Sequence, residues 1–217
     1  MFHHTHPYPP FNLENATKII VGTLPPPRFT TKEFKQGDVD FCYGSIDGQL
    51  WPILDKIFNL NLKFETTEEA IAQRKKFLVT RNLGICDIVG SAKRAKIDAS
   101  DIGMQEVILR DILHYLEKFP NINTLLFTGG SSKNGPEYFF RKACKAAGIK
   151  LEVEDDTVPR IHSFELTGRV IKTVSLTAPS GAANRAVGSS PLYKELKRKN
   201  PDFNTIDFRV MQYKPFF

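Results

Sequence analysis

Two short apolar segments, each running into glycine, constrain the fold of this chain more than any other feature. Residues 18–22 read KIIVG, and residues 124–128 read TLLFT before Gly129 and Gly130. Apolar runs of this length are typical of strands that are buried on both faces of a parallel sheet. Each run leads through a loop into a segment with helical spacing of apolar residues. The repeated order of strand, loop and helix predicts an α/β fold built on a parallel sheet.

Capping residues and apolar spacing predict the other elements. Ser190 and Pro191 are typical of an N-cap and a first helical position, and Gly148 is typical of a residue just after a helix. The stretch 23–48 has no helical period and is predicted to be a long loop, which in a compact domain is usually functional. A shorter loop is expected at 81–84. We expect helices at 49–58, 67–79, 108–119, 136–147 and 191–198, and strands at 18–22, 124–128, 151–153 and 170–176.

Length and composition fit one packed domain. The 217 residues carry a net charge of +6 and are 41% hydrophobic, which is ordinary globular usage. We expect a single domain over 1–217, with 1–17 as an N-terminal tail. The chain shows neither a secretory signal nor a membrane-spanning run, so a cytoplasmic protein is expected. The three cysteines and the histidines of the tail lack metal-site spacing, so we expect no metal.

The predicted topology places a functional site at one edge of the sheet. Carboxyl ends of parallel strands lie at the same edge, so the loops 23–48, 128–135 and 177–190 should converge there. The phosphate-binding patterns GxGxxG and GxxxxGK[ST] are absent from these loops. This absence argues against an enzyme that uses a nucleotide cofactor.

The first of these loops has the composition of a wall for a flat ligand. Prolines 25–27 stiffen it, and Tyr43, Asp47 and Trp51 follow. Core packing is the expected role of Trp51. Asp47 precedes a predicted helix, so it is either an N-cap or a catalytic carboxylate, and both roles are compatible.

Two other segments have features of contact with phosphate. The basic run 93–96 is either a solvated surface or a phosphate-binding patch. The late loop 177–185, TAPSGAANR, contains small residues that permit close backbone approach, together with Asn184 and Arg185. It is either a plain turn between strand and helix or a segment that contacts a sugar-phosphate backbone.

Taken in order, these segments resemble the uracil-DNA glycosylase superfamily, closest to its mismatch-specific and hypoxanthine-type branches. VGTLP at 21–25 matches the family's strand followed by G-x-x-P. YGSIDGQLWPIL at 43–54 keeps the register of its Y-G-H-P-x-N-x-F-W-x-x-L. GICDIV at 84–89, with Arg94 and Asp98, is similar to G-I-x-x-W-D-V-x followed by R and D.

The later motifs complete the resemblance, which spans residues 18–188. LFTG at 126–129 stands where the family carries F-N-G, and APSG at 178–181 is similar to its N-P-S-G. The resemblance implies a three-layer αβα fold with a short central parallel sheet. The three cysteines cannot supply the four iron–sulfur ligands of the thermophilic branch. The family's functional asparagines fall here on Thr23 or Leu24, on Gly48 and on Thr128.

The resemblance implies an enzyme that flips a deaminated or mismatched base out of DNA and hydrolyses its N-glycosidic bond without a cofactor. In this interpretation Asp47 orients water or stabilises the cationic sugar from a partly dry pocket. Gly48 favours an alternative, a catalytically silent nucleic-acid-binding module, and a small-molecule nucleosidase is a third possibility. We expect a monomer that binds duplex DNA and no membrane. The implied residues are Asp47 and Thr23 for catalysis; Leu24, Pro25, Phe41, Tyr43 and Thr128 for the base; and Ser180, Gly181, Ala182, Asn184, Arg185, Lys93 and Arg94 for DNA.

Overall fold

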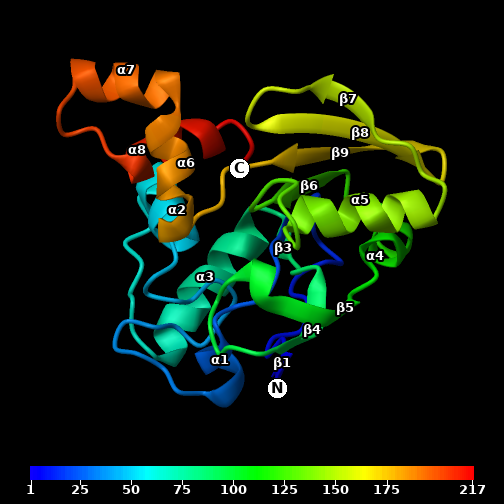
Figure 1. Ribbon diagram of the computed structural model, residues 1–217, viewed down its shortest axis with the longest axis horizontal. Helices are drawn as coiled ribbons and strands as arrows, with labels where there is room; N and C mark the ends of the chain where they lie inside the picture. Colours follow the sequence, from blue (N-terminus) through cyan, green and yellow to red (C-terminus); the bar gives the residue numbers. More distant parts are fainter.

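The computed structural model describes all 217 residues and arranges them around one large and one small sheet (Figure 1). The strands are β1 (Phe2–Thr5), β2 (Lys18–Val21), β3 (Leu83–Ile85), β4 (Val89–Arg94), β5 (Met104–Leu109), β6 (Thr124–Phe127), β7 (Glu152–Asp155), β8 (Arg160–Leu166) and β9 (Arg169–Ser175). The helices are α1 (Pro27–Thr31), α2 (Leu50–Phe58), α3 (Glu68–Thr80), α4 (Ile112–Lys118), α5 (Pro136–Ala146), α6 (Asn184–Ser189), α7 (Pro191–Lys199) and α8 (Thr205–Tyr213), with 3₁₀ turns at Asp101–Gly103 and Gly181–Ala183.

The large sheet has the order β3-β2-β6-β9-β8-β7. Its first four strands are parallel, and β8 and β7 are added antiparallel at one edge. The prediction of a parallel α/β sheet is therefore confirmed for the half that contains the two apolar segments. The strand predicted at 151–153 overlaps β7, whereas β8, which pairs antiparallel with both β7 and β9, was not predicted.

Both faces of the parallel strands are covered. On β2, Ile20 joins one core cluster with helices α2, α3 and α8, whereas Ile19 and Val21 join a second cluster with α4, α5 and the small sheet. On β6, Leu126 faces the first cluster and Phe127 the second. This alternation is the period-2 geometry of a strand, and it explains why both central strands are apolar throughout. The result is the predicted three-layer arrangement.

Most predicted helices begin and end where the capping residues indicate. Thr67 accepts a hydrogen bond from the Ala70 amide at the start of α3, and Ser190 accepts one from the Tyr193 amide at the start of α7. The predicted helix 108–119 is wrong in its first part. Its first two apolar residues belong to strand β5, and helix α4 begins only after Asp111, whose side chain accepts a hydrogen bond from the His114 amide.

The segment predicted to be an N-terminal tail is part of the fold. Its strand β1 pairs antiparallel with β4, and β4 pairs with β5, which makes the small sheet. His4 and His6 are buried. The predicted loop at 81–84 overlaps strand β3, which pairs with β2. No helix combines the length and the apolar character needed to cross a membrane.

Candidate active site

Hydrogen bonds connect the loops that follow the carboxyl ends of the parallel strands. The Gln49 amide donates to the Pro179 carbonyl at 2.9 Å, and Gly48 forms a bridge with Ser180, so the first and the last loop meet. The Tyr43 hydroxyl bonds to Thr128 at 2.9 Å and joins the first loop to the loop after β6. The predicted convergence of the three loops is confirmed.

Gly22, the residue directly after β2, allows two polar side chains to pack closely against the end of this strand. Its amide donates to Asp87 Oδ1 at 2.9 Å. A Cβ at this position would clash with the Tyr43 hydroxyl oxygen and would lie 2.8 Å from Asp87 Oδ1. Only glycine therefore lets the tyrosine and the carboxylate approach this strand end together.

Asp87 is buried, and hydrogen-bond donors stabilise its carboxylate. His6 Nε2 lies 2.9 Å from Asp87 Oδ2, while His6 Nδ1 accepts a hydrogen bond from the Tyr8 amide. These two bonds assign the ring proton to Nε2, which donates to the carboxylate. The N-terminal segment thus holds Asp87, the first of two carboxylates in the site, in place.

Tyr43 reaches the strand ends in a strained backbone conformation, with φ of +56°. Its hydroxyl lies between Thr128 and Asp87, and burial, together with the nearby Asp87 charge, raises the pKa of the phenol well above its ordinary value. The hydroxyl therefore stays protonated and neutral. In this arrangement the tyrosine ring occupies the space between the end of β2 and the end of β6.

A second carboxylate, Asp101, contacts the loop after β2 from the other side. The Thr23 hydroxyl donates to Asp101 Oδ1 at 2.7 Å, and Asn134 Nδ2 donates to the Asp101 carbonyl at 2.9 Å. Burial raises the pKa of Asp101 to about 6. A carboxylate with this pKa accepts a proton more readily than an ordinary aspartate and is still largely ionised at neutral pH. No local spacing in the sequence indicates Asp101, because its partner Thr23 lies 78 positions away.

Asp47 does not lie in the environment that we predicted. Its side chain is 62% exposed and pairs with Lys35 at 3.0 Å and Arg28 at 3.3 Å. Neither a partly dry pocket nor an N-cap is present there, since α2 begins at Leu50 after Gln49 with no side-chain cap. The basic side chains of the long loop draw this carboxylate to the surface.

Phe41 is wrongly predicted as a residue that stacks on a base. Its ring is buried in an aromatic cluster and lies 5.8 Å from Phe11 and 6.4 Å from Trp51. Trp51 is buried as expected, and its indole N–H donates to the Cys42 carbonyl. The prolines and leucine of the first loop are nearer to the site: Pro25 is buried and Leu24 packs against the second core cluster.

Arg94 is wrongly predicted to contact DNA, because its side chain is fully buried. Its Nε donates to His4 Nδ1 at 2.8 Å and its Nη1 donates to the Ser100 carbonyl. Lys93 is partly exposed on the small sheet and pairs with Glu106. Within the basic run, Arg94 therefore holds the segment that carries Asp101.

The late loop is a surface segment with one buried anchor. Arg209 is buried and donates to the Ser180 carbonyl and to Asn184 Oδ1. The side-chain oxygen of Asn184 is therefore used within the protein, where it helps to hold the loop. Gly181, Ala182 and Arg185 are exposed, and the Arg185 side chain pairs with no carboxylate.

Comparison with known proteins identifies a likeness of fold. No protein-family model matches the chain, and no curated protein matches it. Among solved structures, it is similar to the solution NMR structure of a protein from Methanosarcina acetivorans that is provisionally described as a uracil DNA glycosylase. The match has 15% sequence identity and a TM-score of 0.54, and covers 96% of this chain and 99% of the other. This likeness confirms the predicted fold class.

Proposed function

We propose that this chain is a DNA glycosylase that hydrolyses the N-glycosidic bond of a deaminated or mismatched base flipped out of DNA. The observation that carries the proposal is the pair Thr23–Asp101, which sets a carboxylate with a raised pKa beside the loop after β2. The motif resemblance over residues 18–188 and the likeness of fold to a protein provisionally described as a uracil DNA glycosylase support it.

Asp101 is the proposed catalytic carboxylate, and Thr23 is a positioning residue. The water oxygen attacks the anomeric carbon, the bond to the base nitrogen breaks, and the bonding electrons leave with the base. Asp101 accepts a proton from the water, and its negative charge stabilises the cationic sugar as that charge develops. The proton is then passed to the released base through solvent, which completes the hydrolysis.

Tyr43 and Thr128 are the proposed contacts of the flipped base. A base that enters at the carboxyl ends of β2 and β6 must displace the Tyr43–Thr128 hydrogen bond, after which the Thr128 hydroxyl is free to bond to the edge of the base. The aromatic ring of Tyr43 then provides a stacking face. The same hydrogen bond favours the alternative function, a silent nucleic-acid-binding module, because it closes the space in which a base would sit.

The two proposed functions and the nucleosidase are separated by incubating the protein with oligonucleotides that contain uracil, hypoxanthine, xanthine or a G:T mismatch and scoring abasic sites. Free nucleosides form a parallel reaction. Base release from DNA supports the glycosylase, release from nucleosides alone supports the nucleosidase, and DNA binding without release supports the silent module.

The two candidate carboxylates are separated by a matched pair of variants. Asp101→Asn should reduce base release by roughly a hundredfold, the scale of losing one electrostatic or general-base group. Asp47→Asn removes a carboxylate of the same size from the exposed surface and should change the rate little. The opposite ranking would return the catalytic role to Asp47.

A further inference from the structure

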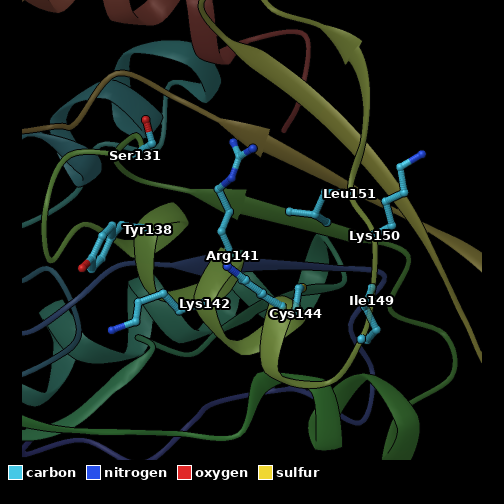
Figure 2. A pocket seen from close by; sticks show the side chains of 10 residues that line it. Ser131, Tyr138, Arg141, Lys142, Cys144, Ile149, Lys150 and Leu151 are labelled. Carbon is cyan, nitrogen blue, oxygen red and sulfur yellow. The ribbon is translucent and has the colours of Figure 1, made fainter.

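A basic groove lies along α5 (Figure 2). We call it the α5 groove. It is lined by residues of α5, by Ser131 and by the segment 148–151 that leads into β7, and its volume is about 660 Å³. Four cations and no carboxylate line it, namely Arg141, Lys142, Lys145 and Lys150.

The cations of α5 follow a helical stripe that begins with an aromatic residue. Tyr138, Arg141, Lys142 and Lys145 have the spacing i, i+3, i+4 and i+7, so they share one face of the helix. At 1.5 Å per residue the stripe extends about 10 Å. In Figure 2, Tyr138 and Lys142 lie on one side of the groove, Lys150 on the other, and Arg141 between them.

The positive charge of the α5 groove is not neutralised by its surroundings. Buried Glu137 is shared by Arg141 at 3.0 Å and Arg160 at 2.6 Å, so one carboxylate faces two guanidinium groups. Lys150 pairs with Glu152 at 2.8 Å. Lys142 stands 5.6 Å from the centre of the Tyr138 ring, and neither it nor Lys145 forms an ion pair.

We propose that the α5 groove binds the sugar-phosphate backbone of the DNA strand next to the flipped nucleotide. The cations of α5, from Arg141 to Lys145, extend about 6 Å along the helix, which matches about two steps of a strand whose phosphates rise 3.4 Å each along a duplex. Ser131 lines the groove and belongs to the loop that follows Thr128, so the groove opens beside the candidate active site. The choice of DNA as the polyanion rests on the proposed function.

The test is the salt dependence of binding to an undamaged duplex, measured for the full chain and for Lys142→Gln/Lys145→Gln. Loss of two phosphate contacts should reduce the slope of log K against log salt by about two, and should weaken binding at least about tenfold at about 50 mM salt. Lys75→Gln/Lys76→Gln removes the same charge from α3 on the opposite face of the sheet and should leave the slope unchanged.

The outcomes distinguish the groove from the proposed function. A reduced slope supports the groove even if no base is released from any oligonucleotide, and base release with an unchanged slope supports the glycosylase while overturning the groove. If the folded double variant loses binding to vesicles of anionic lipid but not to DNA, the groove serves a membrane and the proposal is overturned. A lowered melting temperature with an unchanged slope would assign Lys145 only to stabilising the end of α5, and would also overturn it.

Discussion

At the scale of single residues, the site depends on one glycine that admits two polar side chains. Gly22 directly follows β2, donates its amide to Asp87 and leaves the space that the Tyr43 hydroxyl fills. The sequence predicted a strand end here and placed Tyr43 near it, both of which the structure confirms. It could not predict Asp87 as the partner, because a hydrogen bond between residues 65 positions apart leaves no local pattern.

Gly22→Ala tests this packing. The added methyl group must displace the Tyr43 ring and break its bond to Thr128, so we expect a loss of about 1–3 kcal/mol in the free energy of unfolding. Gly181→Ala is the matched control, since nothing lies within 4 Å of its added Cβ, and it should change stability by less than about 0.5 kcal/mol. Equal effects from the two substitutions, measured by urea unfolding, would contradict the packing.

At the scale of elements, apolar period and caps predicted most helices and the two central strands. The elements that were missed owe their structure to partners distant in sequence. Strand β1, FHHT, has no alternating apolar pattern and exists because β4 supplies its hydrogen bonds. The same strand brings His4 to Arg94 and lies directly before His6, so the segment predicted as a tail holds the site in place.

His4 makes the stability of this N-terminal strand depend on pH. Burial, followed by the nearby Arg94 charge, lowers the pKa of His4 to about 4. The unfolded chain therefore binds more protons than the folded one between about pH 6.5 and 4, and stability falls as pH decreases through that range, by up to roughly 3 kcal/mol. In His4→Gln, which keeps an acceptor for Arg94, the part of the pH dependence of stability that comes from His4 should be absent. Parallel pH curves of unfolding for the two proteins would contradict it.

At the scale of the whole molecule, the two core clusters fix the sheet and the sheet fixes the site. Helix α8 packs against α2, helix α6 packs against α7 and α8, and Arg209 from α8 anchors the late loop (Figure 1). The sequence predicted that three loops converge, because parallel topology requires it. The sequence could not predict that the Asp47 side chain turns outward to Lys35 and the Asp101 side chain inward to Thr23. Both orientations depend on long-range packing.

Arg185 tests the orientation of the molecule on its substrate. It is exposed and without an ion pair on the late loop, at the carboxyl edge of the sheet. If this edge faces DNA, Arg185→Ala should weaken duplex binding for all sequences and reduce the salt slope by about one. Lys76→Ala, near the end of α3 that precedes β3, removes a charge at the opposite edge and should have little effect. Equal slopes for Arg185→Ala and the unmodified protein would place the duplex elsewhere.

The dependence of single-turnover base release on pH tests most directly whether Asp101 acts as the carboxylate of an N-glycosidic hydrolysis. With a pKa of about 6, Asp101 must lose its proton to act, so the rate should rise about tenfold per pH unit below pH 6 and level off above it. Asp101→Asn should react roughly a hundredfold more slowly, with no rise near pH 6. A flat profile in the unmodified protein, or no base released from any damaged or mismatched oligonucleotide, would contradict the account.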